Sequence, residues 1–449
     1  MQNVDRDIIV IGAGGCGLMA ALVAAKKGAR VLLLEKTDKP GGGTAFSSKG
    51  IRAAASRRQR ELKIKDSAAL YAEDILGRNN GESDAILTHR LAENSGRVAD
   101  FLADEAGVEF QIGEFAFGHS VQRSHSWKED KTITDFLFTA VEREKNIEVR
   151  FSTPVLALER DADGAVSGVK TDDGIFSARK IILASGGFGA SAELLSKYIP
   201  KAVGIPFPGH HGSTGDGIKM GLEIGATVEN MGGFQPYPAY LGPGKRAVPP
   251  EVALSGGIMV DADGKRFVDE TRYPGGLSIR MLALPGKQSY EIFDDRIFQL
   301  HRDAPGLRSL GRLFDAGVLL RAETAEKLAE KLGINADGLM RTIRECNALA
   351  DSDEKDAFGR VLPQPLEAPY YGIRVTVALY HTQGGLKVNA DGQVIRADGS
   401  IILNLYAGGG VAVGVSGKGL EGYLPGNGLL ASLGLGMIAA EHAVTSLSE

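Results

Sequence analysis

The chain has 449 residues, 43% hydrophobic and 24% charged, which is typical of a globular protein with domains of roughly 150 residues each. Its formal net charge of −5 provides no basic field, so we expect no nucleic-acid partner and no binding to an anionic membrane. The two cysteines, Cys16 and Cys346, form no metal-binding or redox motif, so we expect no bound metal and a reducing, cytoplasmic location. We also expect no secretory signal and no membrane span, because no apolar run reaches about 20 residues.

The start of the chain predicts a strand, a tight turn, a helix and a second strand. Residues 7–11 are rich in Ile and Val, residues 12–17 are mostly glycine, residues 18–28 are rich in alanine, and residues 30–35 are again apolar. This order is one βαβ unit, the smallest part of a doubly wound α/β fold.

Three glycines and an acid in this unit form a dinucleotide-binding fingerprint. Gly12 allows the tight turn, Gly14 lets the backbone approach a pyrophosphate, and Gly17 lets helix and strand pack closely. The helix N-terminus favours the pyrophosphate charge, and Glu35 can accept hydrogen bonds from the ribose hydroxyls. If these glycines served only to make turns, there would be no reason for all three of them and Glu35 to stand at these positions of one βαβ unit. We therefore predict a binding site for NAD or FAD.

Later glycine clusters favour FAD over NAD. Residues 41–44 read Gly-Gly-Gly-Thr and follow the second strand directly, as expected if the ligand continues across the domain. Residues 184–187 and 407–410 each end an apolar strand in glycines, where backbone can face the same cofactor. The sequence has no second fingerprint for NAD(P)H, no haem-attachment motif and no iron–sulfur cysteine spacing, so FAD is the only redox group expected.

The middle of the chain differs from its two ends in composition and in its pattern of predicted elements. Prolines and turns are frequent after Tyr237, residues 322–350 predict a pair of helices, and the strand-plus-glycine pattern returns at His381. We therefore predict an α/β fold, a Rossmann-like FAD-binding domain with an inserted α+β capping domain. The predicted ranges are 1–237 and 379–449 for the FAD-binding domain and 238–378 for the capping domain.

Several motifs together resemble one flavoprotein family. They are the fingerprint with Glu35, residues 41–44, residues 215–218 (Gly-Asp-Gly-Ile), residues 264–270 (Gly-Lys-Arg-Phe-Val-Asp-Glu), residues 382–385 (Thr-Gln-Gly-Gly) and Gly426-Asn427. Over nearly its whole length the chain resembles the FAD-dependent fumarate reductase and succinate dehydrogenase flavoproteins, a family that includes the 3-ketosteroid dehydrogenases. The ketosteroid dehydrogenase branch is the nearest, because residues 423–428 resemble its Y-P-G-x-G segment.

The resemblance implies an enzyme with a mobile cap and hydride transfer between flavin N5 and a carbon–carbon bond next to a carbonyl. It implies non-covalent FAD, because no histidine follows residues 41–44 where covalent-flavin members carry one. Gly410 departs from the family, since many members have an acid there. The predicted cofactor-binding residues are Gly12, Gly14, Gly15, Gly17, Glu35, Lys36, Gly42, Gly43, Thr44, Gly50, Val155, Ser185, Gly186, Gly187, Asp216, Gly409, Gly410, Asn427 and Leu429.

Three tyrosines stand where the dicarboxylate enzymes of this family hold substrate with two histidines and an arginine. Tyr237 and Tyr380 take the places of the histidines, and Tyr423 takes the place of the arginine. A phenol donates a hydrogen bond but cannot neutralise a carboxylate, so a dicarboxylate substrate is disfavoured. Tyr237, Tyr380 and Gly426 are the predicted substrate-binding residues.

The predicted catalytic residues are Arg272, Tyr273, His381, Tyr423 and Gly428. By resemblance, Arg272 fits the family's proton-donating arginine and Tyr273 fits the base of the ketosteroid dehydrogenases, and the sequence leaves both open. Tyr423 with a glycine N–H would polarise a substrate ketone, as an oxyanion hole does. His381 contacts flavin or substrate, or it supports residues that do.

Three functions remain open at this point. The first is desaturation of a cyclic ketone at its α,β carbons, or reduction of the enone, with oxygen, a quinone or a redox protein as the external electron acceptor. The second is reduction of an unsaturated carboxylate with Arg272 as the acid. The third is a non-catalytic FAD-binding electron carrier.

Overall fold

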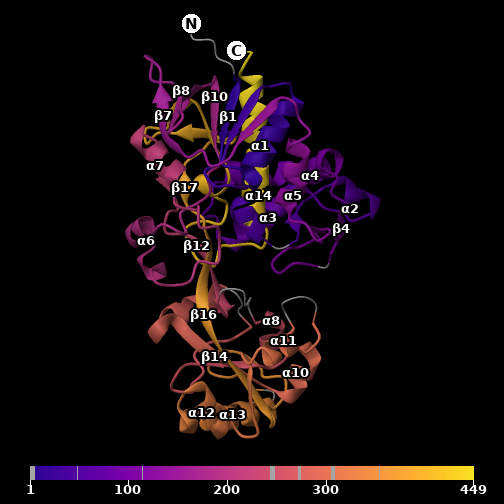
Figure 1. Cartoon of the computed structure of the whole chain (residues 1–449). Coiled ribbons are helices and arrows are strands. Elements are labelled where there is room, and N and C mark those ends of the chain that lie inside the picture. The colour runs from indigo at the N-terminus through magenta and orange to yellow at the C-terminus, as the bar shows by residue number, and fades with distance from the viewer. Residues whose placement is uncertain are drawn as a thin grey trace. The chain divides into compact units, whose positions relative to one another are not determined.

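The computed structural model describes residues 6–47, 49–113, 115–242, 248–271, 275–304, 309–352 and 354–448. The chain divides into two compact units (Figure 1). Unit 1 comprises residues 1–203, 209–235 and 381–449, and unit 2 comprises residues 204–208 and 236–380. Unit 2 is thus an insertion in unit 1, and it also takes in residues 204–208, which the sequence-based division left outside the capping segment.

A six-stranded sheet forms the centre of unit 1, in the order β18-β19-β10-β1-β2-β6. Its strands are β1 (Ile8–Ile11), β2 (Val31–Leu34), β6 (Ile147–Arg150), β10 (Lys180–Leu183), β18 (Gln393–Ile395) and β19 (Ile401–Ala407). The strands from β19 to β6 are parallel, with Ile9 of β1 opposite Ile181 of β10 and Leu32 of β2. All four side chains of β1 are buried, which explains its unbroken apolar sequence.

Helices α1 (Gly15–Lys26) and α14 (Asn427–Thr445) pack against each other beside this sheet (Figure 1). Their backbones approach closely, because a Cβ at Gly436 would lie 2.5 Å from the carbonyl oxygen of Cys16. Within the described ranges, α14 is the one helix long and apolar enough to cross a membrane, a feature the sequence analysis missed. Most of its apolar window is buried, and Leu433 and Met437 join the core around α1, so α14 serves here as a core helix.

The remaining elements of unit 1 surround the central sheet. The helices are α2 (Arg57–Glu61), α3 (Ala68–Arg78), α4 (Ala85–Ala106), α5 (Ile133–Val141), α6 (Ala192–Tyr198) and α7 (Asp216–Glu223), with short 3-10 helices η1 (Gly42–Phe46), η2 (Pro200–Ala202) and η5 (Gly409–Val411). The small sheets join β3 (Ile51–Arg52), β4 (Gln111–Ile112) and β5 (Ser124–Ser126), then β7 (Val155–Arg160), β8 (Val166–Thr171) and β9 (Gly174–Ser177), and finally β11 (Val228–Glu229) and β17 (Gly385–Leu386).

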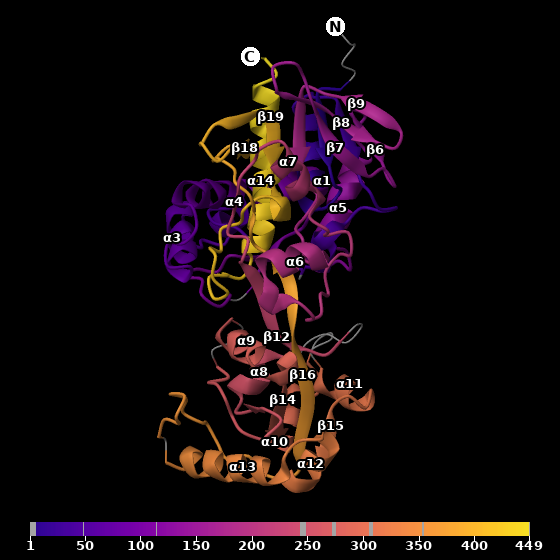
Figure 2. The same cartoon turned by 90° about the vertical axis from the view of Figure 1, so that its left-hand side faces the viewer.

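Unit 2 is built on an antiparallel sheet (Figure 2). It has its own apolar core. Its strands are β12 (Phe234–Tyr240), β13 (Ile258–Val260), β14 (Gln288–Asp294), β15 (Leu320–Ala322) and β16 (Tyr370–Thr382). Its helices are α8 (Pro250–Leu254), α9 (Gly275–Leu282), α10 (Asp295–His301), α11 (Leu310–Asp315), α12 (Ala325–Leu332) and α13 (Ala336–Ala350), with η3 (Pro285–Lys287) as a 3-10 turn. The helical pair predicted over residues 322–350 corresponds to α12 and α13, which Gly333 separates in a left-handed conformation.

Candidate functional site

The predicted cofactor-binding residues of unit 1 gather at one edge of the six-stranded sheet. Gly12 and Glu35 directly follow β1 and β2, while Ser185 and Gly409 lie just beyond β10 and β19. These strands are parallel, so their carboxyl ends meet at the same edge. In open α/β sheets this is the edge at which ligands bind.

Two fingerprint glycines are required by the protein's own packing, whereas a Cβ at the third would make only van der Waals contacts. Gly12 has a φ of 107°, and a Cβ there would lie 2.6 Å from the carbonyl oxygen of Ala184. A Cβ at Gly17 would overlap the carbonyl oxygen of Gly12. A Cβ at Gly14, by contrast, would meet no atom closer than 3.8 Å. The space at Gly14 is what close approach of a pyrophosphate needs.

Glu35 is held against the turn between β1 and α1. Its carboxylate is buried and accepts hydrogen bonds from the backbone N–H of Ala13 at 2.8 Å and from the N–H and hydroxyl of Thr37 at 2.9 and 2.8 Å. These bonds fix the orientation of an acceptor that can serve the ribose hydroxyls. The next residue, Lys36, lies within 2.6 Å of the Asp216 carboxylate, so two predicted residues 180 positions apart lie together.

The glycine-rich loop at residues 41–46 is seated on the fingerprint. Gly41 donates a hydrogen bond to the carbonyl of Ala13 at 2.9 Å, and the hydroxyl of Thr44 accepts one from Gly15 at 3.3 Å. No atom lies within 4 Å of a Cβ built at Gly43. The loop therefore offers free backbone next to the space at Gly14, as a cofactor that crosses the domain requires.

The glycines beyond β10 and β19 meet the Thr-Gln-Gly-Gly segment. A Cβ at Gly410 would lie 2.7 Å from the backbone nitrogen of Gly187, and Gly186 has a φ of 78°. The hydroxyl of Thr382 accepts a hydrogen bond from Phe188 at 3.3 Å. Motifs more than 190 residues apart in sequence thus form one surface in unit 1.

Buried polar atoms on this surface lack partners within the protein. In the described part of the chain, no hydrogen bond reaches Ser185 Oγ, Gln383 Nε2 or Asn427 Oδ1. Buried polar groups are nearly always hydrogen-bonded, so these atoms fit a ligand rich in donors and acceptors. With the room at Gly14 and the open space at Gly43, they fit FAD.

Three further predicted residues lie nearby in unit 1. A Cβ at Gly50 would lie 3.3 Å from Arg52 Nη1, Val155 opens β7 opposite Thr171, and Leu429 in the first turn of α14 packs against the core. Their contact with the cofactor stays a prediction.

Three of the predicted catalytic residues lie together where α14 begins. The rings of His381 and Tyr423 are 5.2 Å apart between centroids and meet edge to face. A Cβ at Gly428 would lie 3.3 Å from His381 Nε2 and 3.7 Å from the Tyr423 hydroxyl. The backbone groups of Gly426 and Gly428 hydrogen-bond to that hydroxyl. The residue pattern therefore assembles a donor cluster at a helix N-terminus.

The protonation states of this cluster follow from burial. Burial raises the pKa of the Tyr423 phenol, and hydrogen bonds from Gly426 and Gly428 only partly oppose that rise, so Tyr423 stays protonated and can donate. Burial lowers the pKa of His381, so its ring is neutral. His381 Nδ1 lies 3.3 Å from the carbonyl oxygen of Thr382, which only accepts, so Nδ1 carries the proton. Nε2 is then a buried acceptor, without a partner among the described residues.

The sequence analysis missed Arg52 and Tyr71, which lie close to Tyr423. The stem of Arg52 packs onto Gly426, and the Arg52 charge acts on both phenols. A lone arginine within the small-residue run at positions 50–56 was the available signal. A cation therefore lies beside Tyr423 in unit 1, on strand β3.

The other predicted site residues belong to unit 2 or lie outside the described residues. The rings of Tyr237 and Tyr380 stack at 4.6 Å with an interplanar angle of 6°. Both are substrate-binding predictions, and the structure brings them together. Arg272 and Tyr273 lie outside the described residues, so their choice as acid or base stays open.

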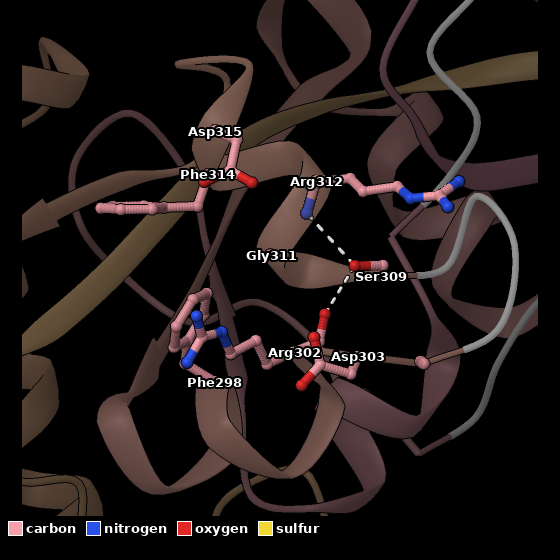
Figure 3. A pocket seen from close by; sticks show the side chains of 9 residues that line it. Phe298, Arg302, Asp303, Ser309, Gly311, Arg312, Phe314 and Asp315 are labelled. Atoms are coloured by element: carbon pink, nitrogen blue, oxygen red, sulfur yellow. Dashed lines mark hydrogen bonds between the residues drawn. The ribbon is translucent and has the colours of Figure 1, made fainter.

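A hollow in unit 2 lies between α10 and α11, with a volume of about 460 Å³ (Figure 3). Arg302 and Asp303 line it from the side of α10, and Arg312 and Asp315 line it from α11. Ser309 closes one end by donating to the carbonyl of Arg302. Among the predicted site residues that the structure describes, none lines this hollow.

The chain matches the family described as "FAD binding domain" over residues 7–429. It belongs to that family. It is 31% identical to "Fumarate reductase (cytochrome)" of Shewanella frigidimarina over 97% of this chain and 76% of that protein. It is 30% identical to "NADH:fumarate oxidoreductase" of Klebsiella pneumoniae (strain 342) over 97% of this chain, but it spans only 47% of that relative's length. "Urocanate reductase" of Eggerthella lenta is 32% identical over 91% of this chain and 70% of that protein.

Solved structures of this family share the fold. A flavocytochrome c3 fumarate reductase in its open conformation aligns with a TM-score of 0.85 at 28% identity, covering 99% of this chain and 79% of that chain. The 3-ketosteroid delta1-dehydrogenase of Sterolibacterium denitrificans aligns with a TM-score of 0.82 at 21% identity, covering 98% and 99%. The predicted family, the α/β fold with its FAD-binding domain and cap, and the FAD cofactor are confirmed. The chain is an FAD-dependent oxidoreductase of the fumarate reductase family.

Proposed function

We propose that this oxidoreductase desaturates a ketone, most simply a cyclic one, at its α,β carbon–carbon bond, or reduces the corresponding enone. The observation that carries the proposal is the meeting of Tyr423, His381 and the N-terminus of α14. When bound, FAD accepts or supplies the hydride. The external electron acceptor would be oxygen, a quinone or a redox protein, and the location would be cytoplasmic.

The donors in this cluster suit a carbonyl oxygen. The Tyr423 hydroxyl donates to that oxygen, while the backbone groups of Gly426 and Gly428 stabilise the phenol oxygen as it gains negative charge. A polarised carbonyl makes the hydrogen on its α-carbon acidic. His381 Nε2, a neutral acceptor without a partner among the described residues, would take that proton, and Arg272 and Tyr273 are alternatives outside the described residues.

The second candidate is reduction of an unsaturated carboxylate. It is favoured by Arg52, a cation beside Tyr423, and by the names of the relatives that act on fumarate and urocanate. The non-catalytic carrier has no particular residue in its favour, because a bare electron carrier needs no donor cluster of this kind.

Flavin absorbance under anaerobic conditions separates these candidates. The first predicts that cyclohexanone bleaches the oxidised flavin or that cyclohexenone reoxidises the reduced flavin. The second predicts reoxidation by fumarate-like acids, and the carrier predicts neither.

A tyrosine variant tests the role of the cluster. Losing one donor to a developing oxyanion slows turnover about 100- to 1000-fold, so we expect that effect from Tyr423→Phe with FAD still bound. Tyr406→Phe is the matched control, because the Tyr406 hydroxyl contacts His442 instead. Brisk fumarate reduction that is unaffected by Tyr423→Phe would contradict the proposal.

A further inference from the structure

Arg52 is a partly buried cation with no acid partner in the described part of the chain. Among the described residues, its buried Nε makes no hydrogen bond, and its one side-chain bond is a long contact of 3.4 Å from Nη1 to the carbonyl of its neighbour Ile51. No ion pair among the described residues includes it. The buried Arg123, by comparison, is paired with Asp66 and Asp74.

Such an arrangement is unfavourable for the protein alone. A guanidinium withdrawn from water without a counter-charge is strongly destabilising, and proteins normally pair or expose it. Asp66 and Asp74 do not serve this purpose, because both carboxylates bind Arg123. Since no described residue supplies the counter-charge, an anionic ligand would supply it.

A second unsatisfied donor lies beside Arg52. Tyr71 is fully buried, and its hydroxyl has no partner among the described residues. The phenols of Tyr71 and Tyr423 both feel the Arg52 charge, and the Arg52 stem lies against Gly426 at the start of α14. Two neighbouring orphan donors and a helix N-terminus form a site for an anion.

We infer that Arg52, together with the hydroxyl of Tyr71, binds the carboxylate of a substrate that carries one negative group near its conjugated carbonyl, while Tyr423 stays free to donate to the ketone oxygen. The guanidinium fork matches the two oxygens of a carboxylate, which a lysine in the same place would not. The inference rests on the proposed function for the reaction. It adds that the substrate of this reaction carries a carboxylate. It also gives a role to the cation on β3, which lies beside Tyr423.

Benzoylacrylate and its methyl ester form a matched pair of probes, because both contain the same enone and only the first carries a carboxylate. Binding to the oxidised, FAD-loaded protein is measured from the change in flavin absorbance. Turnover is measured as the loss of the probe's enone absorbance when it is mixed with the reduced protein. We expect Arg52→Gln to weaken benzoylacrylate binding by 10-fold or more and to change ester binding by less than about 3-fold. Arg52→Lys should recover part of the loss.

The control is Arg60→Gln, which removes an exposed arginine of the neighbouring helix α2 and should leave both affinities unchanged. Thermal stability distinguishes a ligand-binding arginine from a structural one, because loss of a structural arginine would lower the Tm. Arg52→Gln should be at least as stable as wild type, because it removes an unpaired charge, and benzoylacrylate should raise the Tm of wild type only.

The outcomes separate the two proposals. Equal weakening of acid and ester by Arg52→Gln, or no binding of benzoylacrylate to wild type, would overturn the anion site. Tight, Arg52-dependent binding of benzoylacrylate without any turnover would uphold the anion site and refute the proposed reaction.

Discussion

Glu270 accepts two parallel hydrogen bonds from Arg266 in the interior of unit 2, from Nε at 2.9 Å and from Nη2 at 2.8 Å. The same carboxylate also receives Arg360 Nη1 at 2.5 Å, and Arg266 pairs further with Asp356 at 2.6 Å. Residues 264–270, by which the sequence resembles the flavoprotein family, therefore contain a buried ion network. In the described residues this network is a structural feature of unit 2.

Replacing Glu270 should destabilise the protein severely. Glu270→Gln leaves two buried guanidinium groups without their shared counter-charge, and breaking a buried pair in this way costs about 3–5 kcal/mol of unfolding free energy. Urea or guanidinium titration would measure the loss. The control is Glu323→Gln, which breaks an exposed pair with Arg321 and should have no measurable effect. Similar midpoints for the two variants would show that the network contributes little.

Glu291 should make stability depend on pH. Burial on β14, and next the charge of Glu270, raise the pKa of the Glu291 carboxyl from 4.5 to about 8. The folded state then binds this proton more tightly than the unfolded state, so its contribution to stability is present at low pH and is lost as pH rises through about 8. The slope would be at most about 1.4 kcal/mol per pH unit. Glu291→Gln should flatten this part of the profile of unfolding free energy against pH, and identical slopes would contradict the prediction.

Two glycine variants should separate folding from cofactor binding. Gly17→Ala forces a Cβ onto the carbonyl oxygen of Gly12, so we expect loss of soluble, folded protein. Gly43→Ala places its Cβ in open space, so we expect a wild-type fold with a lower FAD content. Circular dichroism and the flavin-to-protein absorbance ratio measure the two effects. Full FAD occupancy in Gly43→Ala would remove Gly43 from the cofactor site.

His381 should act as a neutral acceptor over the physiological range. Because burial lowers its pKa below 6.5, turnover should stay level as pH falls to that value and should decline only in more acidic solution. His381→Asn should reduce turnover about 100-fold or more with FAD retained, since general acid–base groups contribute at least that much. His89→Asn, on the exposed side of α4, is the control. An inflection near pH 6.5 in the wild type would show that His381 becomes protonated there, or that another group controls the rate.

Local spacing explains which parts of the site could be predicted from sequence. Gly12, Gly17 and Glu35 lie within one βαβ unit, so their positions in the sequence already determine their geometry. Arg52 escaped notice because its role depends on β3 bringing it against Gly426, a contact between residues more than 370 positions apart. The family resemblance predicted both Tyr237 and Tyr380 as site residues. Their stacking could not be predicted, because it depends on the pairing of β12 with β16.

The order of strands in unit 1 has a consequence for biosynthesis. Strand β10 sits between β1 and β19, and the apolar surface of α1 is covered by α14. A ribosome that has released residues 1–300 has therefore produced a nascent chain with an open sheet edge at β10 and an uncovered α1. Such surfaces are prone to aggregate and are typical targets of chaperones. The predicted FAD-binding residues lie on both sides of the insertion, so we expect FAD capture to be a late event that follows release of residues 401–445.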